Sequence, residues 1–224
     1  MDIRDFIDNS ILKPHKTKRE VEEFVLRSAD IGFKAVCLNP CHVRLASEIA
    51  GSRIRICSVV GFPLGANAKE VKIHEAVRAV RDGAHEVDMV MNVSAFKSGN
   101  YRAVREEIRA VVRETGTATV KVIVETCYLT DEEKARAVEV CLEGGADFIK
   151  TSTGFGPGGA TVEDVKLFKK VGGGRIKVKA AGGIRDLKTA IAMIEAGADR
   201  IGTSSGFEIY RESLAQKKHL EEGK

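Results

Sequence analysis

No apolar stretch of the 224-residue sequence approaches the roughly 20 residues that a membrane-spanning helix needs. The 5 cysteines are odd in number and no two have CxxC spacing, which argues against a disulfide framework. Residues 1–10 alternate acidic and apolar side chains, unlike a signal or transit peptide. We therefore expect a cytoplasmic protein with free thiols. A zinc site from Cys37, Cys41 and His42 is a minor alternative, because it lacks a second ligand pair.

A strong charge of either sign is also missing. The formal net charge is +4, and Lys and Arg are interleaved with Glu along segments of helical periodicity. This pattern is typical of solvated helix faces rather than of a nucleic-acid-binding surface. A mildly basic protein still suits an anionic small-molecule substrate. We expect neither a nucleic-acid nor a membrane partner.

Short β-branched runs alternate with longer amphipathic segments along the chain. The predicted strands are Ile7–Leu12, Lys34–Leu38, Ile54–Val60, Glu86–Met91, Val120–Glu125, Phe148–Thr151, Ile176–Ala180 and Arg200–Thr203. The predicted helices are Lys18–Asp30, His42–Ala50, Ala68–Arg81, Arg102–Glu114, Asp131–Glu143, Val162–Lys170, Leu187–Glu195 and a last one from Phe207. A βαβα unit repeated in this way predicts a parallel sheet.

The predicted helix ends carry recognisable signals. Thr17, Asn67 and Thr130 each precede a glutamate by three residues, the spacing of a capping box. Glycines that can take the left-handed cap conformation follow four of the helices, at Gly32, Gly83, Gly145 and Gly197.

We predict one domain over residues 1–224, folded as a single (βα)8 TIM barrel with parallel strands. Its last residues, 216–224, are expected to form a flexible tail. An open doubly wound sheet is the alternative, but no GxGxxG motif follows the first predicted strand.

Ionisable side chains occupy strand positions that should face the barrel interior. In Ile176–Ala180 the apolar alternation leaves Lys177 and Lys179 inward, and the same parity turns Asp88 and Lys150 inward. The strand at 120–125 adds Lys121, Ile123 and Glu125 to this inward set. Buried charges are costly unless they pair or change protonation.

Position along the strand separates two interpretations of these lysines. Lys121 and Lys177 come early in their strands, which favours a structural salt-bridge layer. Lys150 and Lys179 come at the C-terminal ends, where barrel active sites are built. A neutral lysine beside a second cation is a nucleophile that forms an imine, and Asp88 could serve as its acid or base. The parity does not rank Lys150 and Lys179.

Three glycine- and hydroxyl-rich loops, at residues 151–156, 181–185 and 202–206, follow successive predicted strands. Glycine backbone and helix N-termini at these strand ends are typical of a phosphate site. Arg185 could contact the phosphate or form a surface ion pair. The candidate substrate-binding residues are Thr151, Thr153, Gly154, Gly182, Gly183, Ile184, Arg185, Gly202, Ser204 and Ser205.

Segments 146–154 (ADFIKTSTG), 178–185 (VKAAGGIR) and 86–90 (EVDMV) resemble the deoxyribose-phosphate aldolase family, and the resemblance extends over nearly the whole chain. It implies a class I aldehyde-lyase without metal or cofactor. Such a lyase interconverts 2-deoxy-D-ribose 5-phosphate with D-glyceraldehyde 3-phosphate and acetaldehyde, in deoxyribonucleotide and carbohydrate catabolism. We also expect a homo-oligomer.

The resemblance assigns roles to particular residues. It implies that Lys150 forms the Schiff base, that the charge of Lys179 keeps it neutral, and that Asp88 is the acid/base. Phosphate contacts fall on Gly154, Gly182, Gly183, Arg185, Gly202, Ser204 and Ser205. The chain departs from some family members: residue 155 is phenylalanine instead of lysine, and residues 219–224 contain no tyrosine, which leaves tail-assisted proton transfer an open question.

Two other functions fit the same pattern. A phosphate-binding barrel isomerase, or a related aldolase acting on another sugar phosphate, would use the same loops but would form no covalent adduct with acetaldehyde. A non-enzymatic phosphosugar-binding barrel would use the buried charges only for stability. Cys37 is expected near the barrel mouth as a buried packing residue.

Overall fold

One closed parallel barrel contains the eight strands of the described chain. The computed structural model describes residues 1–222, with side chains described for residues 1–218. Each strand pairs with the next in sequence, and β8 closes the barrel against β1. The strands are β1 Ile7–Ile11, β2 Ala35–Leu38, β3 Arg55–Val60, β4 Glu86–Val90, β5 Thr119–Ile123, β6 Phe148–Lys150, β7 Lys177–Ala181 and β8 Arg200–Thr203. The predicted (βα)8 barrel is confirmed, and the open sheet is wrong.

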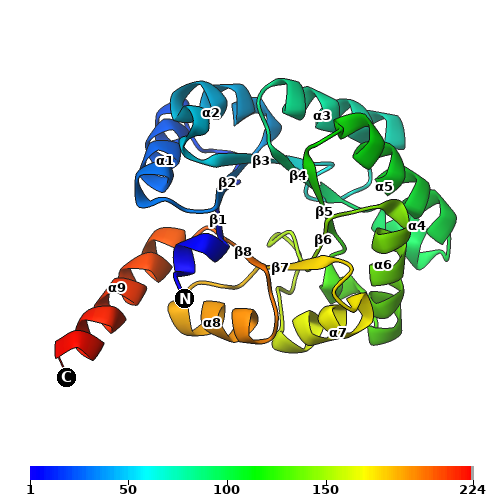
Figure 1. Cartoon of the computed structure of the whole chain (residues 1–224). Helices are drawn as coiled ribbons and strands as arrows, with labels where there is room; N and C mark the ends of the chain where they lie inside the picture. The colour runs from blue at the N-terminus through cyan, green and yellow to red at the C-terminus, as the bar shows by residue number, and fades with distance from the viewer. Residues whose placement is uncertain (223–224) are drawn as a thin grey trace.

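Helices surround the barrel as an outer ring (Figure 1). The α-helices are α1 Lys18–Ile31, α2 Val43–Ala50, α3 Lys69–Arg81, α4 Val93–Lys97, α5 Tyr101–Thr115, α6 Asp131–Gly144, α7 Val162–Gly172, α8 Leu187–Glu195 and α9 Gly206–Glu222. Short 3-10 helices are η1 Ile3–Phe6, η2 Pro40–His42, η3 Gly51–Arg53 and η4 Thr126–Tyr128. The sequence did not predict α4. The flexible tail over 216–224 stays a prediction: residues 216–222 continue α9, and residues 223–224 lie outside the described residues.

The capping predictions are confirmed at two helices and wrong at the third. Thr17 and Thr130 both form complete capping boxes. Asn67 caps nothing: α3 begins at Lys69, one residue later than predicted, so Ala68 occupies the N-cap position. All four predicted glycines have positive φ, and Gly32 and Gly145 are left-handed C-caps.

The barrel strands separate apolar from ionisable side chains by face. Val178 and Ala180 of β7 belong to the apolar core shared with the helices, and so does Val87 of β4. The alternate residues Lys179 and Asp88 lie in the barrel interior, where they form an ion pair. The predicted inward parity of these two residues is confirmed, and it brings charges from different strands into one buried space.

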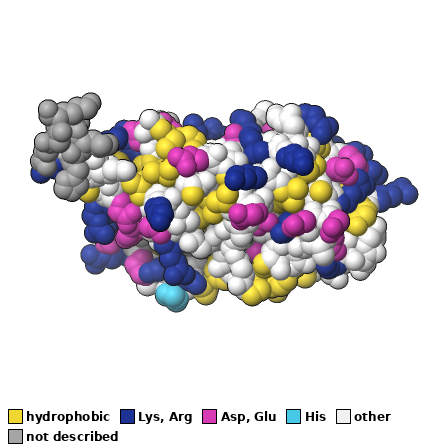
Figure 2. All heavy atoms as spheres, turned by 90° about the horizontal axis from the view of Figure 1, so that it is seen from below, with side chains coloured by type: hydrophobic (Ala, Val, Ile, Leu, Met, Phe, Trp, Pro, Cys, Tyr) yellow, Lys and Arg dark blue, Asp and Glu magenta, His cyan; other side chains and the backbone are white. Residues whose placement is uncertain are grey.

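The protein surface carries both signs of charge. On the face seen in Figure 2, Lys and Arg side chains are interspersed with Asp and Glu. Helix α1 illustrates the pattern with the i,i+4 pairs Lys18–Glu22 and Arg19–Glu23. Within residues 1–222, no helix has both the length and the apolarity required to cross a bilayer.

Candidate active site

Asp88, in the middle of β4, is the centre of a buried polar network. Its Oδ2 lies 2.7 Å from the Nζ of Lys150 and 2.7 Å from the Nζ of Lys179. Its Oδ1 accepts from Lys121 at 2.9 Å and from the thiol of Cys57 at 3.1 Å. Strand register produces this convergence, because Lys150 and Lys179 are neighbours across β6 and β7, and Asp88 is paired with Lys121 across β4 and β5. Each oxygen of the Asp88 carboxylate therefore accepts two hydrogen bonds.

A second layer of charge lies around this centre. Asp8 of β1 contacts Lys179 at 2.5 Å and Arg200 at 3.2 Å, as ion pairs without hydrogen-bond geometry. Glu86 contacts Lys121 at 2.5 Å and Arg200 at 2.7 Å. We call the whole set the interior cluster; it consists of Asp8, Glu86, Asp88, Lys121, Lys150, Lys179 and Arg200. With every group ionised, its four cations exceed its three carboxylates by one charge.

The charges of the cluster stabilise one another. Burial by itself raises the pKa of Asp88, but the three lysines lower it well below its usual range. Burial likewise opposes ionisation of Glu86, yet Lys121 and Arg200 bring the pKa of Glu86 to about 2. Burial lowers the pKa of Lys179, but Asp8 and Asp88 raise it above its ordinary value. Asp88 and Glu86 therefore remain ionised and Lys179 remains protonated.

Access to solvent distinguishes the two candidate nucleophiles. A cavity of about 650 Å³ opens at the C-terminal end of the barrel, and Lys150 is one of its lining residues. Lys179 and Asp88 do not line it and are fully buried beneath it. Lys150 is the last residue of β6, which brings its amine to the cavity floor. The structure thus supplies a ranking of the two lysines that strand parity could not.

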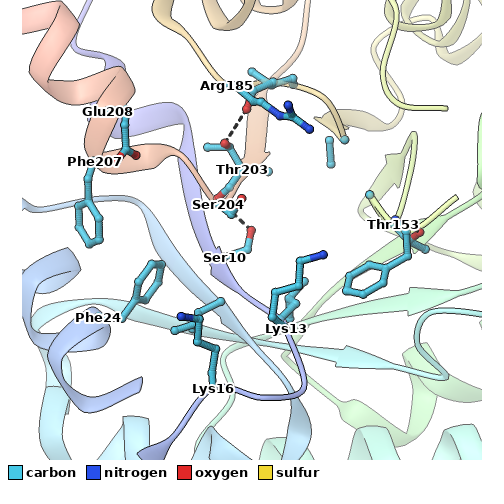
Figure 3. A pocket seen from close by; sticks show the side chains of 18 of the residues that line it. Ser10, Lys13, Lys16, Phe24, Thr153, Arg185, Thr203, Ser204, Phe207 and Glu208 are labelled. Carbon is cyan, nitrogen blue, oxygen red and sulfur yellow. Dashed lines mark hydrogen bonds between the residues drawn. The ribbon is translucent and has the colours of Figure 1, made fainter. Parts of the chain in front are cut away.

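Most of the predicted substrate-binding residues surround this cavity (Figure 3). Those that line it are Thr153, Gly154, Gly182, Gly183, Ile184, Arg185, Gly202 and Ser204. Thr151 does not, because its hydroxyl is bonded to the backbone of Ala181 in β7, which it contacts at 3.0 Å as both donor and acceptor. Ser205 also lies outside the lining; its N–H donates to the Thr203 hydroxyl at 2.9 Å.

The phosphate-site prediction is supported by electrostatics as well as by shape. Helices α8 and α9 both begin just beyond the glycine loops, at Leu187 and Gly206, and helix N-termini attract anions. Arg185 is exposed at the cavity, and no carboxylate in the described chain lies within ion-pair distance of it. The surface ion pair considered as its alternative role is not formed. This end of the barrel can hold a phosphate group.

Glu125 departs from the predicted inward set. Strand β5 ends at Ile123, and Glu125 has a positive φ of 53°, which breaks the alternation of side chains. Its carboxylate instead accepts hydrogen bonds from the backbone N–H and the hydroxyl of Thr153. Glu125 therefore holds the β6–α7 loop, one wall of the cavity, and does not join the interior cluster.

Three side chains could in principle hold a metal ion within the described residues. Possible ligand atoms of Cys37, Cys57 and Asp88 lie within 4.8 Å of one another, and all three residues are buried. The chemistry fits a cation poorly, because Asp88 is already surrounded by lysines and burial raises the pKa of the Cys57 thiol well above its ordinary value. The zinc alternative from the sequence is not supported either, since Cys41 is exposed whereas Cys37 is buried, as predicted.

Sequence reasoning missed several members of the network. Asp8 was overlooked because β1 reads Ile7-Asp8-Asn9-Ser10, three polar residues in succession that hide the inward parity. Arg200 begins β8, and only the closure of β8 on β1 reveals its proximity to Asp8. Lys121 was predicted to be structural, and it does pair with Glu86, but it also contacts Asp88 directly.

Comparison with known proteins agrees with this geometry. The model of the family described as DeoC/LacD family aldolase matches residues 6–212. The deoxyribose-phosphate aldolase of Aquifex aeolicus (strain VF5) is 61% identical over 220 residues, which cover 98% of this chain and 99% of that protein. A solved structure described as QR15, an aldolase, has a TM-score of 0.94 and 60% identity, and the match covers 98% of each chain. The structure of deoxyribose phosphate aldolase from Aeropyrum pernix, described as a unique tetramer, has a TM-score of 0.90 and 33% identity over 96% of this chain and 92% of that one. The chain belongs to the DeoC/LacD family of aldolases.

Proposed function

We propose that this protein is a class I deoxyribose-phosphate aldolase, which interconverts 2-deoxy-D-ribose 5-phosphate with D-glyceraldehyde 3-phosphate and acetaldehyde. The observation that carries the proposal is the position of the Lys150 amine. It lies at the floor of the cavity formed by the glycine loops, and it contacts the carboxylate of Asp88, which also contacts Lys179. The names of the relatives support the choice of substrate.

The reaction follows from a neutral amine at this position. The Lys150 nitrogen attacks the aldehyde carbon of the open-chain sugar, and loss of water leaves an iminium ion. Removal of the proton from the hydroxyl of C3 then breaks the C2–C3 bond, and the iminium takes up the electron pair as an enamine. Glyceraldehyde 3-phosphate leaves. Protonation of the enamine carbon and hydrolysis of the imine release acetaldehyde and restore the amine.

The interior cluster places a second, fully buried cation beside Lys150. The cluster carries one excess positive charge when all seven groups are ionised, and Lys179 stays protonated because Asp8 and Asp88 raise its pKa. Lys150 and Lys179 approach the same oxygen of Asp88 at 2.7 Å each, and like charges held on one carboxylate repel each other. We propose that Lys179 is the cation that supports attack of the Lys150 amine on the substrate aldehyde.

Asp88 contacts both amines and is the proposed proton carrier. Its ionised state in the free protein means that it can accept a proton from the intermediate, although its low pKa makes it a weak base. We propose that it holds this proton only briefly, with Lys179 as the other member of the relay. Asp88 also fixes the orientation of Lys150 through the 2.7 Å hydrogen bond.

The decisive assay is cleavage of 2-deoxy-D-ribose 5-phosphate by the purified protein, with both products measured by coupled dehydrogenases. Formation of acetaldehyde and glyceraldehyde 3-phosphate in equal amounts supports the proposal. An isomerase would consume the substrate without releasing acetaldehyde, and a phosphosugar-binding protein would do neither. Either of these results would refute the aldolase assignment.

We further propose a homo-oligomer working in the cytoplasm, with a place in deoxyribonucleotide and carbohydrate catabolism. The described tetramer of the Aeropyrum pernix relative supports assembly, and the five free cysteines suit a reducing compartment. Light scattering coupled to size exclusion tests the first point: elution of a monomer at micromolar concentration would contradict it.

A further inference from the structure

Lys13, in the loop between β1 and α1, is a cation of the cavity that none of the predicted phosphate loops contains. Its side chain is exposed and lines the same cavity as Lys150, Gly154 and Arg185. Figure 3 shows its amine across the cavity from Arg185, with Ser10 and Ser204 to one side in this view. Within the described residues, no carboxylate lies at ion-pair distance from Lys13.

Two of the other cations of the cavity are held by carboxylates. Lys16 pairs with Glu20 at 2.7 Å, and Lys150 is held by Asp88. Arg27 lies 4.0 Å from the centre of the Phe207 ring, on the wall formed by α1 and α9. Arg27 has no carboxylate partner among the described residues either, so Lys13, Arg27 and Arg185 are the lining cations outside an ion pair.

An aromatic pair holds Lys13 in place at the mouth of the cavity. Its Nζ lies 4.9 Å from the centre of the Phe155 ring, and Phe155 in turn packs edge-on against Phe62 at 5.2 Å. A ring face attracts a cation without neutralising its charge. Because Phe155 follows Gly154 directly in the chain, this contact brings Lys13 to a glycine loop and leaves its three N–H donors available.

We propose that Lys13 binds the phosphate of the substrate from the wall opposite Arg185, positioned by Phe155. A phosphate monoester carries about two negative charges at neutral pH, which the charges of Lys13 and Arg185 together match. Lys13 would therefore determine the preference for phosphorylated over unphosphorylated sugars. This inference rests on the proposed function for its substrate, but the binding of phosphate itself can be measured without turnover.

The test combines phosphate titration with kinetics on two substrates. Lys13→Gln removes the charge, Lys13→Arg keeps it, and Lys18→Gln removes the same charge from an exposed position outside the cavity. Isothermal titration of each variant with inorganic phosphate gives Kd. Cleavage of 2-deoxyribose 5-phosphate and of unphosphorylated 2-deoxyribose gives KM and kcat for each sugar.

We expect Lys13→Gln to raise Kd for phosphate and KM for the phosphorylated sugar about tenfold, the effect of one charge-assisted hydrogen bond. Its kinetics with unphosphorylated 2-deoxyribose should match those of the wild type. Lys13→Arg should restore most of the affinity, and Lys18→Gln should change nothing. Phe155→Leu should weaken phosphate binding by about two- to fivefold, because the ring orients the cation.

Two results would overturn the assignment: no difference between Lys13→Gln and Lys18→Gln, or an equal loss with both sugars. A large effect of Arg27→Gln with none at Lys13 would transfer the role to Arg27. Failure of the wild-type protein to cleave either sugar would instead refute the proposed function, and the phosphate titration would still decide the role of Lys13.

Discussion

The amines of Lys150 and Lys179 lie at the same distance, 2.7 Å, from a single oxygen of Asp88. Lys150 is a lining residue of the cavity, whereas Lys179 is fully buried beneath it. This relationship assigns different tasks to two chemically identical side chains. The accessible amine can meet a carbonyl, and the buried one can only supply charge and protons.

Lys150→Met is expected to abolish catalysis without unfolding the protein. The substitution keeps the apolar part of the side chain and removes the nucleophile, so kcat/KM for deoxyribose 5-phosphate should fall by roughly three orders of magnitude or more. Asp88 keeps Lys121 and Lys179 as partners, so the free energy of unfolding should change by about 1 kcal/mol at most. Urea denaturation measures it. A protein that unfolds on this change would favour a purely structural role for Lys150.

Lys121→Met is expected to destabilise the fold strongly. Lys121 is fully buried and contacts Glu86 at 2.5 Å and Asp88 at 2.9 Å, so its loss removes one buried cation from two buried carboxylates. The free energy of unfolding should drop by about 3 kcal/mol in urea titrations. Arg55→Gln is the matched control, because Arg55 binds the same Glu86 but its side chain is 45% exposed, and its loss should cost less than about 1 kcal/mol. Equal effects of the two substitutions would contradict a special contribution of the buried contacts of Lys121.

The stability of the protein should decline in acid over a defined range. The pKa of Glu86 is lowered from 4.5 to about 2 in the folded protein, so the unfolded chain binds a proton at higher pH than the folded one. The stabilisation is present above pH 4.5 and is lost as the pH falls toward 2. Denaturant titrations from pH 6 to about pH 2 should show a steeper decline for the wild type than for Glu86→Gln. The same substitution at exposed Glu48 is the control, and an unchanged slope for Glu86→Gln would rule out this linkage.

Activity should not depend on a divalent metal. The cluster of Cys37, Cys57 and Asp88 is unsuited to a cation, because lysines already surround the carboxylate and the Cys57 thiol stays protonated. Dialysis against EDTA should leave kcat unchanged, and elemental analysis should find no stoichiometric zinc. Activity lost to the chelator and restored by added metal would mean that the reaction class is wrong.

Strand patterning predicted much of this site because the alternation of side chains is local information. It identified Asp88 and Lys179 as inward residues even though nothing in the sequence states which strands touch. The register between strands is not local: it determines that Lys150 lies beside Lys179 and that Asp88 reaches both. Asp8 was missed because successive polar residues in β1 hide its inward parity, and because its partner Lys179 lies on a strand that meets β1 only through β8.

The limits of local reasoning are equally clear outside the barrel. Asn67 is a residue type that often caps helices, but α3 begins one residue later than predicted, so Asn67 does not occupy the N-cap position. Glu125 follows the parity of β5 in sequence, but a positive φ turns it toward Thr153. Lys13 has no motif of its own, and its position at the cavity emerges only when the β1–α1 loop meets Phe155.

The most direct test of the central claim is to reduce the protein with borohydride in the presence of acetaldehyde and to map the modified peptide by mass spectrometry. An imine on Lys150 should be trapped as a stable ethyl-lysine in the peptide that contains Phe148–Lys150. The modification should be absent from Lys150→Met. No adduct, or one on Lys179, would contradict the assignment of Lys150 as the nucleophile.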